Sequence, residues 1–399
     1  MLKQRINLSN NNPNNIPPVA NAGADTLIVL PTNSVVLRGT ATDIDGMIMG
    51  YTWKKIDGPT TFTLTNAATP NATVTNLVAG SYKFELSVTD NNNTKAFDTV
   101  QVIVNTAGNF SDCGCDRILR PQADGGIYVR LQTANVQPGE RICILAGVYP
   151  FISIEGVVGT AEKPVQIINC GGVVQVSPVL RADGTFGGGS YGLRMVKSRH
   201  FKLSGTGMPG ITYGFKIDGS TKVIANGVAV SDSCGDFSVN NVEVTKSQAG
   251  FIMKTNPSNC APGTWGPNWT MRNLELFNNY IHNVEGEGFY IGNTNYTSTV
   301  TDCSGASIVV PVQVIRNVRV YNNVFDTTGW DGIQVATAPE GVEIFNNIVR
   351  NFGYINKGSQ QAGILLGGRS NGRVYNNIVQ NGTGNGIQVF DTKFDSASW

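Results

Sequence analysis

The chain has 399 residues, of which 47 are glycine and 14% are charged, and this composition favours β-structure over helix. Its 29 basic and 28 acidic residues nearly cancel and form no basic run, which excludes nucleic acid and membrane surfaces as expected partners. No apolar stretch approaches the roughly 20 residues of a membrane span, so we expect no membrane insertion.

Seven cysteines favour an exported protein, secreted or held at a cell surface, although the first residues lack the apolar core of a signal peptide. The cysteines are Cys113, Cys115, Cys143, Cys170, Cys234, Cys260 and Cys303. Their spacing matches no zinc-ribbon pattern, because Cys113 and Cys115 stand closer together than the usual two-residue ligand gap. We therefore favour structural roles over metal binding.

Short alternating runs in residues 16–105 are separated by Asp-Gly and Asp-Asn turn signals, which predicts about seven strands packed as a β-sandwich. Trp53 stands where an Ig-like domain places its core tryptophan, and Tyr82 precedes a strand as a corner tyrosine would. Residues 1–15 are expected to be disordered. Residues 106–116 are expected to be a linker.

Four short segments of this region carry a family resemblance. They are residues 39–46 (GTATDIDG), 51–53 (YTW), 77–82 (LVAGSY) and 88–91 (VTDN). Through them the region resembles a PKD domain, and in secreted bacterial proteins such domains mostly act as spacers or make weak contacts with glycans and proteins. Asp43 and Asp45 can hold a calcium ion, but a solvated turn is the favoured interpretation.

The second half of the chain repeats one short pattern. Its four copies are residues 274–279 (LELFNN), 318–323 (VRVYNN), 342–347 (VEIFNN) and 372–377 (GRVYNN). In three of them a glycine and a short strand follow ten residues after the first asparagine. The coil of Asn346 needs seven residues more than this spacing to reach Gly363, and so contains an inserted loop. Such coils cannot bury an apolar face alone and stack about 4.8 Å apart.

The stacking predicts which side chains form columns. Glu275, Arg319, Glu343 and Arg373 fall in one column of alternating sign, in which neighbours attract. An aromatic column beside it contains Phe277, Tyr321, Phe345 and Tyr375. The asparagine pairs are expected to hydrogen-bond from coil to coil at a bend.

Residues 137–149 (QPGERICILAGVY) and 163–172 (KPVQIINCGG) look like the first coils of a known family. With the repeats, they make the chain similar to the right-handed parallel β-helix proteins of the pectate-lyase-like superfamily. The predicted fold class is all-β, an N-terminal Ig-like β-sandwich of PKD type followed by a right-handed parallel β-helix over residues 117–399. Because the sequence stops straight after a coil with no capping element, we expect a truncated C-terminus.

Two long insertions, residues 255–269 and 293–310, leave the same edge of consecutive coils. Each carries one cysteine, and we predict a disulfide between Cys260 and Cys303. Cys143 and Cys170 are expected in the first coils, either buried as small apolar residues or paired. The sequence does not place the other three cysteines.

A candidate site follows from the columns. The residues before successive glycines share one column, which puts Glu287 and Asp331 one strand spacing apart. Alternation after the glycine turns Lys254, Tyr290 and Gln334 outward. Two carboxylates that meet can share a proton, act as nucleophile and acid in glycoside cleavage, or bind calcium.

Four more polar residues lie one bend earlier in the same coils. They are His282, Glu285, Asp326 and Arg350, and all but Glu285 share a column. The two insertions are expected to wall the whole patch into a groove. The plainer interpretation is that a polar residue before a glycine only caps a corner, because such dipeptides are ordinary turns.

The resemblance implies roles for these residues. Lyases of this shape abstract the proton α to a uronate carboxylate with Lys or Arg, helped by calcium. It implies Lys254 or His282 as the base, Glu287 with Asp331 as a possible calcium site, and Arg350 as a clamp for the substrate carboxylate. The residues expected to contact the sugar chain are Tyr290, Gln334, Glu285 and Asp326.

The sequence departs from the family in its catalytic motifs. It lacks the motif set of polygalacturonase-like hydrolases, which is Asn-Thr-Asp, Asp-Asp, Gly-His-Gly and Arg-Ile-Lys, and it also lacks a clear pectate-lyase signature. Whether the chain is an enzyme stays open. The leading hypothesis is an extracellular carbohydrate-active β-helix that binds or cleaves a polysaccharide or cell-surface glycan, as a lyase or, second, as a glycoside hydrolase. The alternative is a non-catalytic adhesin or tailspike-like rod.

Overall fold

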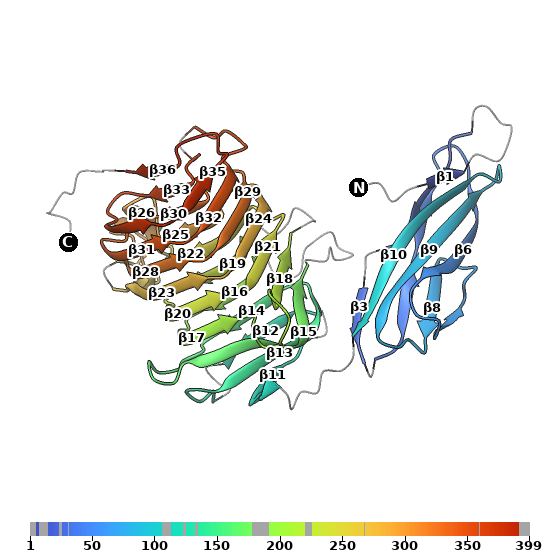
Figure 1. Ribbon diagram of the computed structural model, residues 1–399, viewed down its shortest axis with the longest axis horizontal. Helices are drawn as coiled ribbons and strands as arrows, with labels where there is room; N and C mark the ends of the chain where they lie inside the picture. Colours follow the sequence, from blue (N-terminus) through green and yellow to red (C-terminus); the bar gives the residue numbers. More distant parts are fainter. Residues whose placement is uncertain are drawn as a thin grey trace. The chain divides into compact units, whose positions relative to one another are not determined.

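A computed structural model describes residues 5–7, 15–23, 26–30, 32–105, 113–122, 125–131, 135–177, 191–219, 226–266, 268–358 and 360–390. The chain divides into two compact units, with the division between residues 109 and 110. Figure 1 shows that both consist of strands. No helix within the described ranges is long and apolar enough to cross a membrane.

The first unit is a sandwich of short sheets whose strands pair antiparallel, except that β3 pairs with β10 in parallel. One sheet has the order β1-β10-β9-β6 with β3 against β10, a second has the order β4-β8-β7, and β2 pairs with β5. The strands are β1 (Arg5–Asn7), β2 (Val19–Asn21), β3 (Thr26–Val29), β4 (Val35–Arg38), β5 (Thr40–Thr42), β6 (Ile48–Asp57), β7 (Thr63–Thr65), β8 (Asn71–Thr75), β9 (Gly80–Asp90) and β10 (Lys95–Asn105).

Two aromatic residues fix the core of this sandwich. Trp53 is buried, and its indole N–H donates to the carbonyl of Pro70 at 3.2 Å. Tyr82 is fully buried and its hydroxyl contacts the carbonyls of Thr61 (2.9 Å) and Val78 (3.2 Å). Both expected aromatic positions are therefore confirmed, including the corner tyrosine that bonds backbone upstream of its own strand.

The expectation of a disordered segment 1–15 is wrong for residues 5–7. They form β1 and pair antiparallel with residues 95–97 of β10. The physical reason is that β3 pairs only with residues 102–105 of β10, so that the backbone groups at 95–97 are open to another strand. The rest of that segment up to residue 14 lies outside the described residues.

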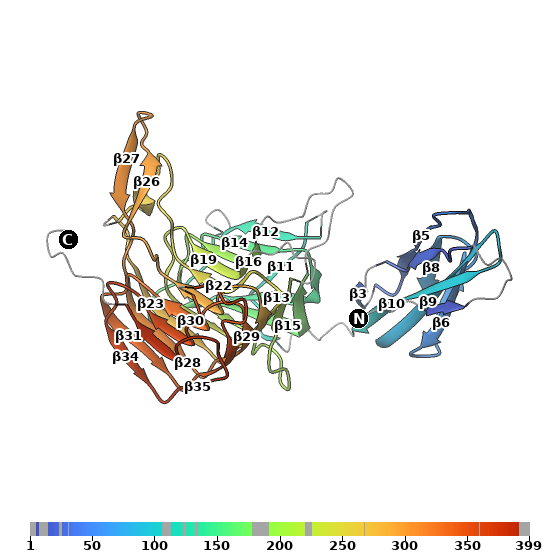
Figure 2. The same cartoon turned by 90° about the horizontal axis from the view of Figure 1, so that it is seen from above.

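The second unit is a parallel β-helix with three faces, which we call A, B and C (Figures 1 and 2). Face A contains β12 (Ile127–Arg130), β14 (Ile152–Glu155), β16 (Tyr191–Val196), β19 (Asn226–Ser231), β22 (Ala249–Met253), β25 (Phe289–Ile291), β30 (Ile333–Val335), β33 (Ile364–Leu366) and β36 (Ile387–Val389).

Faces B and C belong to one 15-stranded sheet that bends at β15. Face B contains β11 (Arg117–Leu119), β13 (Arg141–Tyr149), β15 (Val165–Val176), β17 (Arg199–Ser204), β20 (Gly235–Asn240), β23 (Met271–Phe277), β28 (Ile315–Tyr321), β31 (Glu340–Phe345) and β34 (Gly372–Tyr375). Face C contains β18 (Phe215–Asp218), β21 (Val242–Thr245), β24 (Tyr280–Val284), β29 (Val324–Thr328), β32 (Ile348–Phe352) and β35 (Ile378–Gln380).

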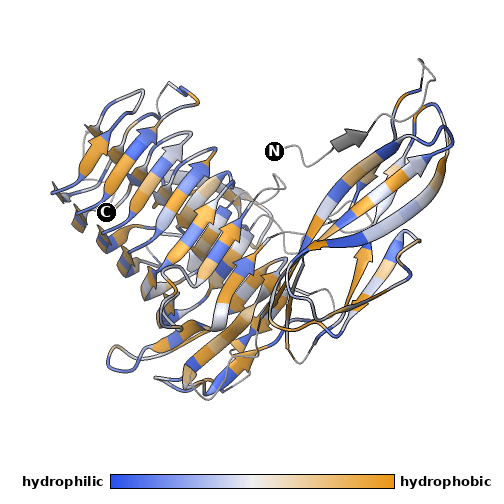
Figure 3. Ribbon diagram, turned by 45° about the vertical axis from the view of Figure 1, so that its right-hand side comes forward, coloured by the Kyte–Doolittle hydropathy of each residue, from blue (hydrophilic) through white to orange (hydrophobic). Residues whose placement is uncertain are grey.

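Each coil runs through faces A, B and C in turn, and inward side chains of all three faces fill one core of Val, Ile, Leu and Phe. Alternation along the strands is visible in the hydropathy colouring of Figure 3. Phe251 and Phe289 stack in this core with ring centroids 4.6 Å apart. The glycines between faces C and A are needed for packing, since a Cβ on Gly288 would stand 2.4 Å from the carbonyl oxygen of Gly332.

Two disulfides fix the first coils. Cys113 bonds to Cys170 and Cys115 to Cys143. The expected linker 106–116 therefore ends earlier than predicted, because its last four residues are cross-linked to β13 and β15 and belong to the β-helix. The part of the linker at 106–112 lies outside the described residues.

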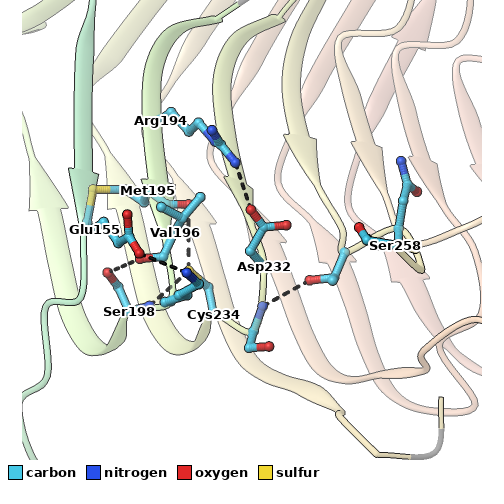
Figure 4. A network of polar contacts seen from close by, with 12 residues as sticks. Glu155, Arg194, Met195, Val196, Ser198, Asp232, Cys234 and Ser258 are labelled. Carbon is cyan, nitrogen blue, oxygen red and sulfur yellow. Dashed lines mark hydrogen bonds and ion pairs between the residues drawn. The ribbon is translucent and has the colours of Figure 1, made fainter. Parts of the chain in front are cut away.

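The seventh cysteine, Cys234, is buried and unpaired. Its sulfur accepts the backbone N–H of Ser198 at 3.2 Å (Figure 4). Burial raises the pKa of this thiol to about 12, so that it stays protonated and packs as a small apolar side chain.

The two residues of each asparagine pair have different structural roles. The first member, such as Asn322 with φ 56°, adopts the left-handed conformation that turns the chain from face B to face C. The second members form an interior ladder, in which the side-chain N–H of Asn323 donates to the Asn347 oxygen at 3.0 Å. The same bond joins Asn279 to Asn323 and Asn347 to Asn377. Among the described contacts, the coil-to-coil hydrogen bonds between asparagine side chains are therefore made by the second residue of each pair.

The two exposed columns predicted on face B are present. Glu275 pairs with Arg319, Arg319 with Glu343 and Glu343 with Arg373 in the strand register. Phe277, Tyr321, Phe345 and Tyr375 stack with ring centroids 4.9 to 5.1 Å apart. These columns fix the register from outside, as the asparagine ladder does from inside.

We predict that Asn323→Ala lowers the free energy of unfolding by about 2–4 kcal/mol, because it leaves several buried polar groups without partners. The neighbouring substitution Asn322→Gly serves as control and should cost less than about 1 kcal/mol, since glycine accepts the same left-handed conformation. Urea unfolding followed by circular dichroism measures both. Equal losses would show that the ladder does not stabilise the coils.

Candidate functional site

A groove of about 940 Å³ opens on the outer side of face A. Its floor crosses β16, β19, β22 and β25, which are hydrogen-bonded neighbours in that order. The residues that matter most for its chemistry are Lys254, Glu287, Tyr290, Trp330 and Lys357. A trough that crosses several coils has a shape that an extended polymer can occupy.

One wall of the groove comes from the inserted loop between β32 and β33. Its residues Ile355, Lys357 and Gln360 line the groove together with Trp330. Backbone hydrogen bonds hold this wall in place, because Trp330 N–H donates to the carbonyl of Gly286 at 3.1 Å and Ile355 N–H donates to that of Gly329 at 3.1 Å.

The opposite wall comes from the first of the two predicted insertions, through Asn256 and Ser258. The second insertion forms the hairpin of β26 (Thr297–Thr301) and β27 (Ser307–Pro311), which projects from the coils in Figure 2. None of the described residues that line the groove belongs to this hairpin. The structure pairs Cys260 with Cys303, so that the disulfide joins the two insertions.

Glu287 lies in the floor of the groove and is only 3% exposed. Its carboxylate accepts a hydrogen bond from the side chain of Gln360 at 3.1 Å. Burial raises its pKa, and the positive charges of Lys254 and Lys357 partly oppose this rise. Glu287 can therefore hold a proton at a higher pH than an exposed glutamate does, which a general acid requires.

Asp331 occupies the next coil in the same column, as predicted, since Gly288 N–H donates to its carbonyl. It is fully buried and does not line the groove. Its Oδ1 accepts the backbone N–H of Ala362 at 2.7 Å, whereas its Oδ2 is buried without a hydrogen-bond partner among the residues that the structure describes. Burial raises its pKa to about 7, and the nearby charge of Glu287 adds to the rise.

Two lysines of the groove each lie over an aromatic ring. The ammonium of Lys254 is 3.8 Å from the ring centroid of Tyr290, and that of Lys357 is 3.5 Å from the ring of Trp330. Both lysines act electrostatically on Glu287. The pairs combine a flat apolar surface with a positive charge, the two features that bind a sugar ring carrying a carboxylate.

An ion pair lies at the far end of the groove. Arg194 on β16 contacts Asp232 at 2.7 Å, as Figure 4 shows. The guanidinium also lies over the ring of Tyr191, 5.1 Å from its centroid. The groove therefore has a cation and an aromatic ring at this end as well.

The structure places three of the predicted site residues elsewhere. His282, Asp326 and Arg350 form the expected column, but it lies on face C and does not line the groove. Arg350 pairs with Asp326 at 2.9 Å, and His282 lies 3.3 Å from Glu243. The hydrogen bond from His282 lowers the pKa of Glu243 to about 2. These side chains are joined to one another and hold adjacent coils together.

The other two predicted contact residues, Glu285 and Gln334, differ in their exposure to solvent. Glu285 is exposed and lines the groove. Gln334 continues the outward column of face A, but it is buried and donates to the hydroxyl of Thr294 at 2.9 Å. The second insertion covers Gln334, which explains why an outward side chain is not accessible here.

Calcium was expected at Glu287 and Asp331. Calcium takes six to eight oxygen ligands, and one oxygen of each carboxylate already accepts a hydrogen bond. Within the described residues, the only cluster of three or more potential metal ligands is Cys113, Cys115 and Cys170, whose sulfurs are in disulfides. The carboxylate pair by itself does not fit a calcium site.

Sequence reasoning missed four groove residues: Trp330, Lys357, Gln360 and Arg194. The signal for Lys357 and Gln360 was the longer coil after Asn346, which predicted a loop but not the direction in which it folds. Trp330 directly precedes the predicted Asp331, and its carbonyl accepts a hydrogen bond from the backbone N–H of Gly353, at the start of that loop.

We predict that Asp331→Asn flattens the pH dependence of stability. The pKa of Asp331 is raised from 3.8 to about 7 by folding, so its contribution is fully present below pH 4 and is lost as the pH rises through 7. Wild-type stability should fall over this window more steeply than that of the variant. Thermal melts between pH 4 and 8 test this, and parallel curves would contradict the burial of a protonated Asp331.

Comparison with known proteins identifies the first unit. Residues 22–104 match a family model for a PKD domain of the KIAA0319-like type. This region is 41% identical over 91 residues to the dyslexia-associated protein KIAA0319-like protein of Mus musculus, a match that covers 23% of this chain and 9% of the relative. Low-density lipoprotein receptor-related protein 11 of Homo sapiens is 33% identical over 99 residues, covering 25% of this chain and 20% of that protein.

Two solved structures are also similar. The solution structure of the PKD domain from KIAA 1837 protein shares 41% identity with a TM-score of 0.21, covering 22% of this chain and 85% of that one. The crystal structure of alginate lyase from Paenibacillus sp. str. FPU-7 shares 18% identity with a TM-score of 0.34, covering 68% of this chain and 97% of that one. The chain spans a fifth or less of these two curated relatives, and its N-terminal unit is a PKD domain.

Proposed function

We propose that the groove on face A binds a polysaccharide that contains uronic acid residues and cleaves it outside the cell. The observation that carries this proposal is the placement of Glu287, with its raised pKa, between two lysine–aromatic pairs on the floor of a groove that crosses four strands. The three disulfides support an oxidising, extracellular location.

The arrangement suits cleavage by β-elimination. A substrate carboxylate beside Lys357 would be paired with positive charge, and the protonated Glu287 would donate a hydrogen bond to it. Both contacts make the proton α to that carboxylate more acidic. Lys254, in its neutral form, would take this proton as the base. The electron pair of the broken C–H bond then forms the ring double bond as the bond to the leaving glycosidic oxygen breaks, and water supplies the proton that this oxygen gains.

The alternative, a non-catalytic rod, rests on one specific observation. Asp331 is fully buried and accepts a backbone N–H, as expected of a residue that caps a corner. However, its Oδ2 is buried without a hydrogen-bond partner among the described residues and its pKa is raised. Both features lower the stability of the fold, so a purely structural role does not explain them. A groove is also an unexpected feature for a plain spacer, whose outer face has no reason to be hollow.

We predict that the protein releases products absorbing near 235 nm, the signal of an unsaturated uronate, from at least one of pectate, alginate and glycosaminoglycans. Lys254→Ala and Glu287→Ala should each lower this rate at least about a hundredfold, because the first removes the base and the second removes the hydrogen bond to the substrate carboxylate. Parallel assays with calcium and with chelator test whether the reaction requires the ion that the sequence led us to expect.

Matched control variants are available on the other faces. Lys216→Ala on face C and Glu275→Ala on face B remove the same kinds of side chain from surface ion pairs, and they should leave the rate unchanged. New reducing ends without absorbance at 235 nm would replace elimination by hydrolysis, with Glu287 as general acid. Absence of both signals and of binding on every polymer would overturn the proposal in favour of the rod.

A further inference from the structure

A second hollow lies on face A beside the groove. It measures about 350 Å³ and opens over the first coils. The residues that line it are Gln122, Tyr128, Phe151, Ser153, Tyr191 and Arg194, with Ile152. Tyr191 and Arg194 also line the groove around Glu287. The two depressions are therefore neighbours on one surface and share a boundary.

The strand register explains why the surface is hollow at two places. One outward column of face A runs through Tyr128, Ser153, Arg194, Ala229, Ile252 and Tyr290. The small side chain of Ser153 leaves a gap between Tyr128 and Arg194, and that of Ala229 leaves a gap beyond Arg194. Large and small residues on neighbouring coils thus form a continuous trough with Arg194 standing between its two parts.

The second hollow carries the same kind of chemistry as the groove. The guanidinium of Arg194 lies over Tyr191, and both residues line the hollow. Arg130 does not line it, but its guanidinium lies over the ring of the lining residue Tyr128, 5.6 Å from the centroid, and pairs with Glu155 at 3.3 Å. With the pairs of Lys254 and Lys357, four cation–aromatic pairs are distributed along face A and its wall. The same combination at successive places suits a ligand that repeats the same unit.

Arg194 also has a hydrogen-bond donor to spare. Its terminal nitrogen is held by Asp232, whereas its Nε is buried and has no hydrogen-bond partner in the part of the chain that the structure describes. A buried guanidinium N–H without a partner costs free energy unless a ligand accepts from it. The Arg194 side chain separates the two hollows. An anionic group of a ligand lying over Ser153 or over Ala229 would therefore be next to this side chain.

We propose that the second hollow is a remote subsite for the same uronate polysaccharide, so that the chain is gripped along face A from Tyr290 to Tyr128. These residues are five strand spacings apart, about 24 Å, which spans several sugar units. This inference rests on the proposed function of the groove and deepens that function. It implies that the protein recognises a long polysaccharide chain and cleaves a bond in the interior of that chain. Tyr128 and Arg194 would then bind sugars far from the bond that breaks.

The test uses size-fractionated oligouronates of two to ten residues from alginate and pectate, with affinity and kcat/KM measured for each length. Wild-type affinity should rise with length and gain roughly tenfold when the chain reaches the second hollow. Tyr128→Ala should remove that gain but leave kcat/KM on the shortest cleaved oligomer unchanged. Tyr128→Phe, which keeps the ring, should retain most of the gain.

Tyr375→Ala is the matched control, because Tyr375 is 38% exposed on face B and Tyr128 is 39% exposed on face A. It should leave the length dependence unchanged. If wild type binds and cleaves oligouronates but Tyr128→Ala shows the same length dependence, the remote subsite is wrong while the groove stands. If no oligomer of any length binds, the proposed function fails and the subsite fails with it.

Discussion

Coil-to-coil hydrogen bonding in a fixed register is the constraint on which the rest of this β-helix depends. The interior ladder of Asn279, Asn323, Asn347 and Asn377 holds one corner of successive coils in line. Once the corner is fixed, every strand that leaves it has its side chains directly above those of the neighbouring coil. Columns of stacked side chains then follow, some facing the core and some facing outward.

The groove is a consequence of the same rule. Columns on face A change from large to small residues between coils, so the surface rises at Tyr290 and Arg194 and falls at Ala229. The corner that brings face C to face A places Glu287 and Asp331 next to each other, where burial raises the pKa of both. A fold that only needed stability would avoid two adjacent buried carboxylates, which is why we assign this place to function.

Counting from the sequence predicted the columns but not the surface that they form. The charged and aromatic columns of face B and the outward column of face A depend only on the repeat, and all are present. His282 and Arg350 were expected one bend before Glu287 and within the same groove, but they do not line it, because one corner separates faces C and A and turns the side chains to different sides of the coil. The wall with Lys357 depends on how a loop folds back on Trp330, which no periodicity encodes.

The central claim is that face A is the glycan-binding surface. Hydroxyl-radical footprinting of the whole chain, with and without a saturating ten-residue oligouronate of alginate or pectate, tests it most directly. Our account predicts protection of Tyr191, Tyr290 and Trp330 on the groove, with Tyr321 and Tyr375 on face B unchanged. Protection confined to face B or to the PKD domain, or no protection by either oligomer, would contradict it.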